Sequence, residues 1–122
     1  MNDFNFNELV RLLTRVTTYR KLQWTPTSEG PFDAKIGKCT IEMSTDYDSS
    51  VGINEYTLSL YNANGEKFNS YTYNESSQEY VILDQLYTSI RDSIYHISES
   101  EQDIMDSLGK LNRQIPEDDL PF

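Results

Sequence analysis

The chain has 122 residues, of which 37% are hydrophobic and 12% aromatic, a composition that supports one compact domain with a modest core. Its net charge is −10, and the charge is uneven: residues 1–40 carry six basic and four acidic side chains, whereas residues 41–122 carry four basic and sixteen acidic ones. This balance disfavours direct binding to nucleic-acid phosphates and suits a basic protein partner.

The first expected element is a helix over about 5–21. Asn5 and Glu8 form an N-x-x-E capping arrangement, with Phe4 and Leu9 spaced as a hydrophobic staple. Helical spacing then gives one apolar face, made of Phe6, Leu9, Val10, Leu13 and Val16.

After a proline- and glycine-containing loop at 25–31, four stretches alternate between apolar and polar residues. They cover residues 32–36, 39–43, 56–61 and 68–73. Gly37 and the pair Asn64-Gly65 favour hairpin turns between the neighbouring strands. Cys39 falls on the apolar side of its strand, so we expect a buried and inert thiol.

Two helices are expected after the strands. Ser76 and Glu79 form a capping box that opens a helix running to about His96. Its apolar face comprises Leu83, Leu86, Tyr87, Ile90 and Ile94. Ser98 and Glu101 repeat the signature and start a short helix whose apolar residues are Ile104, Leu108 and Leu111.

The order of elements predicts an α+β fold: a small antiparallel four-strand meander flanked by an N-terminal helix and two C-terminal helices, with the helices packed on one face. We expect one domain over residues 1–111 and an acidic tail over 112–122. Residues 112–116 would then be the only spacer, so a partner bound to the tail would also touch the body.

No part of this body predicts catalysis. His96, the single histidine, is expected to meet the carbonyl end of its helix, and one histidine with one cysteine falls short of the usual zinc ligands. Phosphate-binding, dinucleotide-binding and nucleophile-elbow motifs do not occur. We therefore expect a protein that is not an enzyme and uses no metal or cofactor.

The location of the protein is also constrained by the sequence. No apolar run is long enough to cross a bilayer, the N-terminus lacks the pattern of a signal peptide, and a single cysteine gives no intrachain disulfide. The sequence therefore predicts a cytoplasmic protein without a membrane partner.

The chain ends in PEDDLPF, in which Glu117, Asp118 and Asp119 precede Leu120, Pro121 and Phe122. These residues resemble the acidic C-terminal tip of bacterial single-stranded DNA-binding proteins. The resemblance covers only the last six or seven residues. The body has neither the five-strand barrel pattern of that family nor its long Gly/Gln/Pro-rich linker, and it resembles no characterised family.

The resemblance implies a binding mode. In that family the terminal phenylalanine enters an apolar pocket on a genome-maintenance protein, a basic side chain holds its carboxylate, and neighbouring basic residues meet the acids. Carried onto this chain, Phe122 is the anchor, Pro121 restricts the backbone, and Asp118 and Asp119 steer the approach. The implied partners are helicases, primosome proteins, nucleases and recombination mediators. The chain would act as an adaptor, decoy or inhibitor, with a phage or phage-defence origin among the options.

Three alternatives stay open. The tail could be an acidic end without a task, or Phe122 could fold back onto its own domain. A third alternative places function in the body, as an immunity-type inhibitor of a basic toxin or as a mimic of DNA charge. That reading requires the acids of residues 41–111 to gather on one face.

Overall fold

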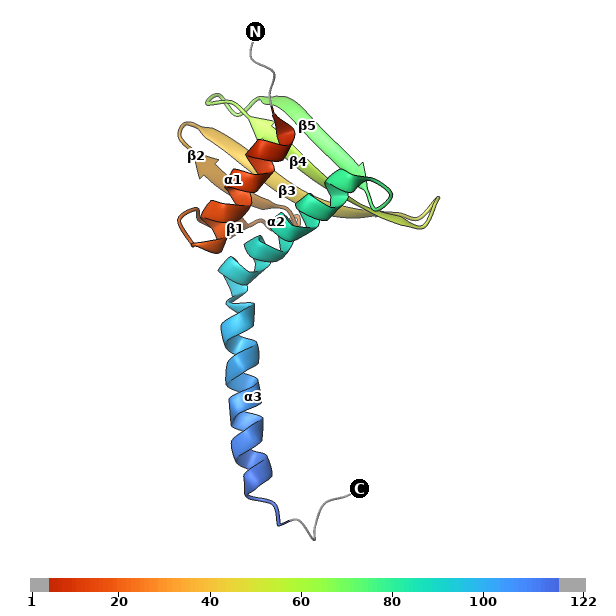
Figure 1. Ribbon diagram of the computed structural model, residues 1–122. Helices are drawn as coiled ribbons and strands as arrows, with labels where there is room; N and C mark the ends of the chain where they lie inside the picture. The colour runs from red at the N-terminus through yellow and green to blue at the C-terminus, as the bar shows by residue number, and fades with distance from the viewer. Residues whose placement is uncertain (1–4, 117–122) are drawn as a thin grey trace.

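The computed structural model describes residues 5–116 and shows an α+β protein (Figure 1). The elements are α1 (Phe6–Thr18), β1 (Trp24–Pro26), β2 (Phe32–Ile36), β3 (Cys39–Asp48), β4 (Ile53–Tyr61), β5 (Lys67–Asn74), α2 (Gln78–Tyr95) and α3 (Ile97–Arg113). The strands form one antiparallel sheet in sequence order, β1-β2-β3-β4-β5. Helices α1 and α2 cover one face of the sheet, whereas α3 leaves the body (Figure 1). The fold class agrees with the expectation.

The sheet has five strands, so the expected number of four was wrong. The additional strand, β1, pairs Trp24 with Ala34 and Pro26 with Phe32 at the edge of the sheet. Three residues ending in proline give no readable alternation, and an edge strand tolerates proline because one side of its backbone needs no partner. The strand begins at Trp24, and its last two residues fall in the segment 25–31 that the sequence indicated as a loop.

The central hairpin is longer than expected. β3 continues to Asp48 and β4 begins at Ile53, so residues 44–48 and 53–55, which fell between the two expected strands, lie in paired strands. In the remaining turn, Asp48 Oδ1 accepts hydrogen bonds from the backbone N–H and the hydroxyl of Ser50, and Gly52 adopts a positive φ of 69°. A glycine suits that conformation because it has no Cβ.

The core lies between the sheet and the two covering helices. Met43 and Leu58 on the sheet are fully buried, as are Leu83, Leu86 and Ile90 on α2. The remaining buried hydrophobic residues are Val10, Leu13, Trp24, Phe32, Ala34, Ile41, Tyr56 and Leu60. The alternating faces of the strands and the apolar faces of α1 and α2 therefore pack as the sequence spacing predicts.

Two polar contacts position aromatic side chains in this core. Trp24 Nε1 donates to Thr17 Oγ1 at 2.9 Å, which joins β1 to the last turn of α1. The Tyr56 hydroxyl donates to Asp84 Oδ1, and burial together with this carboxylate raises the pKa of Tyr56 far above its usual value. Both contacts tie a strand to a helix.

The helix ends show how local chemistry sets the boundaries. Asn5 caps α1 as expected, since its side chain accepts the backbone N–H of Glu8 at 3.0 Å. The helix ends at Thr18, earlier than predicted, because Arg20 turns left-handed with φ 57°. The N–H groups of Arg20 and Lys21 then bond to the carbonyls of Thr17 and Val16, which is a Schellman termination.

The start of α2 differs from the expected capping box. Ser77 occupies the N-cap, but its hydroxyl donates to the carbonyl of Asn74 and caps no N–H of the helix. The Asn74 side chain accepts the N–H of Ser76. An Asx turn thus precedes the helix and replaces the box. Among the helices of the described residues, none is long and apolar enough to cross a membrane.

Candidate functional site

The residues of the expected tip, Glu117 to Phe122, lie outside the described residues. The described chain ends at Pro116, just beyond the far end of α3. What the structure describes is therefore the segment that precedes these residues in the chain, their support.

That support is α3, an exposed 17-residue helix. It contains no buried residue, and Figure 1 shows it projecting from the body with only its first turn near α2. Its apolar side chains are open to solvent, with Leu108 53% exposed and Leu111 57% exposed. The expectation that both C-terminal helices pack on the sheet holds for α2 and was wrong for α3.

A polar junction fixes the point where α3 leaves the body. His96 is the single residue between α2 and α3 and is left-handed, with φ 51°. Its Nδ1 lies 3.2 Å from Glu99 Oε2, and Arg20 Nη2 bonds to Glu99 Oε1. Arg20 and His96 are the non-glycine residues of positive φ in the described chain, and both reach Glu99. Left-handed backbone costs free energy for residues with a Cβ, so the junction is a locally strained and defined bend.

Asp92 completes this junction from the α2 side. Its Oδ1 accepts hydrogen bonds from the backbone N–H of Ser98 at 2.7 Å and from the Ser98 hydroxyl at 2.9 Å. These two bonds, with Arg20 nearby, hold the pKa of the Asp92 carboxyl below its usual value. The bond from Arg20 likewise lowers the pKa of Glu99. Both acids are thus charged at neutral pH, and in this charged form they accept the hydrogen bonds that hold the first turn of α3.

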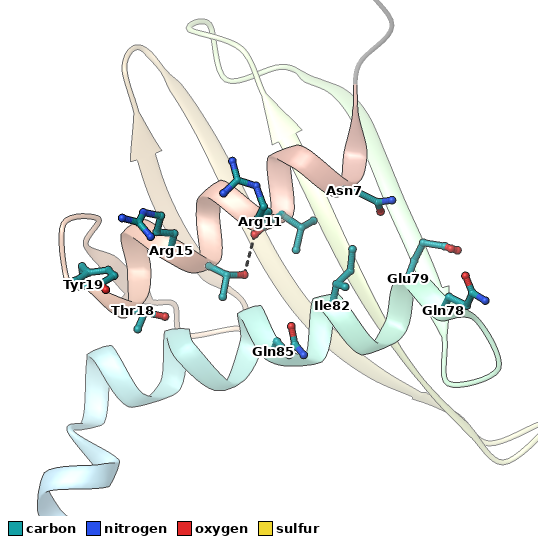
Figure 2. A pocket seen from close by; sticks show the side chains of 11 residues that line it. Asn7, Arg11, Arg15, Thr18, Tyr19, Gln78, Glu79, Ile82 and Gln85 are labelled. Atoms are coloured by element: carbon teal, nitrogen blue, oxygen red, sulfur yellow. Dashed lines mark hydrogen bonds between the residues drawn. The ribbon is translucent and has the colours of Figure 1, made fainter.

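A groove of about 700 Å³ lies between α1 and α2. Figure 2 shows Ile82 and Gln85 reaching from α2 towards α1, with Arg11 and Arg15 on the α1 side. Each arginine already has a local partner. Arg11 bonds to both carboxylate oxygens of Glu8, and Arg15 lies 5.3 Å from the centre of the Tyr19 ring. The groove is open and contains no nucleophile placed beside a base.

The sheet face opposite the two helices is polar. A row of paired residues crosses it from β1 to β5 and comprises Thr25, Asp33, Glu42, Ser59 and Ser70. Asp33 and Glu42 stand directly opposite each other on β2 and β3. Asp33 Oδ1 is buried without a hydrogen-bond partner, and burial raises the pKa of this carboxyl. The row has no third metal ligand: within residues 5–116, no group of three or more His, Cys, Asp or Glu side chains could hold a metal ion.

The two other residues that the sequence analysis considered, Cys39 and His96, lie in different parts of the fold. Cys39 is exposed at the start of β3, so the expected burial of its thiol was wrong. It pairs with Ile36 beside the turn at Gly37, where the sheet is not covered. His96 lies at the end of α2, as predicted, and its described partner is Glu99. Sequence spacing identified the apolar residues of α3, but it carried no signal that they face solvent.

Comparison with known proteins adds no relative: no family model matches the chain, and neither the curated proteins nor the solved structures contain a match.

Proposed function

We propose that this chain is a non-enzymatic protein-interaction module that presents its acidic tip, residues 117–122, at the end of α3. The supporting observation is the exposed helix itself. Seventeen residues at 1.5 Å each give α3 a length of about 25 Å, and none of them is buried against the body. We expected residues 112–116 alone to separate the tip from the body, and α3 adds a far longer spacer.

The proposed partner carries an apolar pocket with a basic rim, as the resemblance of the tip implies. Burying the Phe122 ring contributes roughly 1.5–3 kcal/mol. A charge-assisted bond to its carboxylate adds roughly 1.5–3 kcal/mol. Together these terms give binding at about micromolar strength. The partner class is a genome-maintenance protein that reads the tails of single-stranded DNA-binding proteins, which the chain would recruit, occupy or block.

The alternative of an acidic body receives less support. The acids of residues 41–111 are spread over the sheet, its turns, α2 and α3. Among the described residues, basic side chains interrupt the acidic ones. Lys35 lies on the open sheet face, and Arg11 and Arg15 lie on α1. An inhibitor that mimics DNA charge needs a more continuous acidic surface.

The first test is capture from a bacterial lysate with the full chain and with a variant that lacks Phe122. We expect a small set of genome-maintenance proteins to be captured by the first and lost from the second. Phe68→Ala is a matched control, because this phenylalanine is 58% exposed on β5. Its capture pattern should equal that of the unchanged chain. Identical patterns for the full chain and the Phe122 deletion would contradict the proposal.

The second test uses an identified partner and separates the contributions within the tip. Phe122→Ala should cost on the order of 2–4 kcal/mol of binding free energy. Replacing Asp118 and Asp119 by Asn should cost less binding free energy than Phe122→Ala. Only the salt-dependent part of the binding free energy should be lost, because rim charges are screened within about 8 Å at physiological ionic strength. A variant with one glycine added after Phe122 should bind the partner about as weakly as Phe122→Ala does. Full affinity of the extended variant would exclude a role for the terminal carboxylate.

A further inference from the structure

The apolar side of α3 lacks a partner within the body. Ile104, Met105, Leu108, Leu111 and the following Ile115 are between 46% and 64% exposed. A single helix of this length is marginal in water, because most helical stability in proteins comes from packing of an apolar face. Packing against a further apolar surface would therefore stabilise α3, and the body does not provide such a surface.

The spacing of this apolar side is that of a two-helix seam. Ile97, Glu101, Ile104, Leu108, Leu111 and Ile115 follow one another at alternating intervals of four and three residues. Within α3 the positions are symmetric about Asp106: Ile104 and Leu108 lie two residues away, and Glu101 and Leu111 five. Two copies of α3 that run in opposite directions would therefore set Ile104 of each copy against Leu108 of the other.

The charges of α3 select the direction of pairing. Acidic side chains run from its start to its middle, at Glu99, Glu101, Asp103 and Asp106, and its last turns carry Lys110 and Arg113. Parallel copies would set the acidic halves side by side and place Glu101 against Glu101 in the seam. Antiparallel copies set each acidic half beside a basic end, so that Glu101 meets Leu111 near Lys110 of the second copy. Opposite helix dipoles also favour this arrangement.

The area is sufficient for a reversible dimer. With about half of five large side chains exposed, each helix offers roughly 500 Å² of apolar surface, and pairing would bury about 1,000 Å², the lower bound for a specific interface. Figure 1 shows α3 extending clear of the sheet, α1 and α2, which leaves its length open to a second helix. We propose that α3 pairs with α3 of a second copy of this chain, antiparallel and centred on Asp106. This inference does not depend on the tip.

The mass of the full chain in solution tests the pairing. Sedimentation equilibrium should show a monomer–dimer equilibrium with a dissociation constant of about micromolar strength. Leu108→Glu places a charge in the centre of the seam and should weaken dimerisation at least tenfold. Gln102→Glu adds the same charge away from the seam and should leave it within about twofold. Unchanged Trp24 fluorescence would show that both variants keep the body folded.

The direction of pairing is tested by disulfide formation in a Cys39→Ser background. Ile104→Cys and Leu108→Cys are prepared separately and then mixed under mild oxidation. Antiparallel helices predict a mixed disulfide between the two variants in preference to either symmetric product. A preference for the symmetric products at both positions would overturn the antiparallel arrangement.

Two outcomes would overturn the pairing itself. A wild-type chain that stays monomeric at every concentration would show that α3 does not pair with a second copy of this chain. A dimer that Leu108→Glu leaves intact would place the interface elsewhere on the molecule.

Discussion

Helices α2 and α3 are joined by one residue, His96, and yet they differ completely in burial. Leu83, Leu86 and Ile90 on α2 are fully buried against the sheet and α1, whereas α3 has no buried residue. Both helices have an apolar face with helical spacing. The difference shows that α2 completes a core, while the apolar face of α3 stays exposed to solvent.

The bend at His96 explains how the two helices diverge. Its left-handed backbone redirects the chain. In the first turn of α3, Glu99 then accepts a bond from Arg20, and Ser98 donates its N–H to Asp92. Beyond Glu99, the side chains of α3 described here bond only within the helix, as Gln102 does to Asp106. The body therefore sets the starting direction of α3 without packing against its length.

The largest difference in the free energy of unfolding is expected between the same Leu→Ala substitution on α2 and on α3. Leu86→Ala should lower the free energy of unfolding by about 2–5 kcal/mol, because it opens a cavity in the core. Leu108→Ala should change it by less than about 0.5 kcal/mol in dilute, monomeric protein. Chemical denaturation followed by Trp24 fluorescence measures both. Equal losses would mean that α3 belongs to the core.

A smaller loss is expected at the buried contact between α1 and β1. Thr17→Val removes the acceptor of the Trp24 indole N–H and keeps the volume of the side chain. An unsatisfied buried donor costs about 1–3 kcal/mol. Thr14→Val is the control, since Thr14 Oγ1 bonds only to the carbonyl of Val10 within α1. If the control destabilises as much as Thr17→Val, the indole bond is not the cause.

The junction should respond to acid. The pKa values of Asp92 and Glu99 are lowered in the folded chain, so their stabilisation is complete above the unfolded values near 4 and is lost as the pH falls through the folded values. In an NMR titration, the Ser98 amide and the Asp92 carboxyl should shift together, with a midpoint below that of free aspartate. Arg20→Gln should raise the midpoint of Glu99 more than that of Asp92, because Arg20 is the main cause of the Glu99 shift and a minor cause for Asp92. A common midpoint at or above the free value would contradict the assigned bonds.

The smallest effect is expected at Asp33 on the open sheet face. Its pKa is raised by burial, so the charged form is disfavoured and its cost appears as the pH rises through the folded pKa. Asp33→Asn should therefore stabilise the protein by about half a kcal/mol or less at neutral pH. The gain should vanish below about pH 3, where the carboxyl is neutral in both states. The exposed Glu29→Gln serves as the control in thermal denaturation at both pH values.

Much of the fold could be predicted because the relevant signals are local. The Asn5 cap, the alternation that buries Tyr56, Leu58 and Leu60, and the apolar face of α2 all appear as predicted. Strand β1 was missed since three residues show no period, and Cys39 was misplaced because alternation does not reveal where a sheet ceases to be covered.

The candidate site was harder to predict, because spacing identifies an apolar face without identifying what covers it. Ile104, Leu108 and Leu111 carry the same pattern as the buried residues of α2. Their exposure depends on the backbone of His96 and the reach of Arg20, which no periodicity encodes. The tip, residues 117–122, stays a prediction from its resemblance alone.

The most direct test of this account is amide hydrogen exchange of the full chain at two protein concentrations. We predict that amides of α2 and the central strands are protected equally at both, since they lie in the core. Amides of α3 from residue 101 onward should be protected at high concentration and exchange rapidly at low concentration, as pairing is lost. Protection of α3 that equals that of α2 at every concentration would contradict the account, because it would place α3 in the core of its own body.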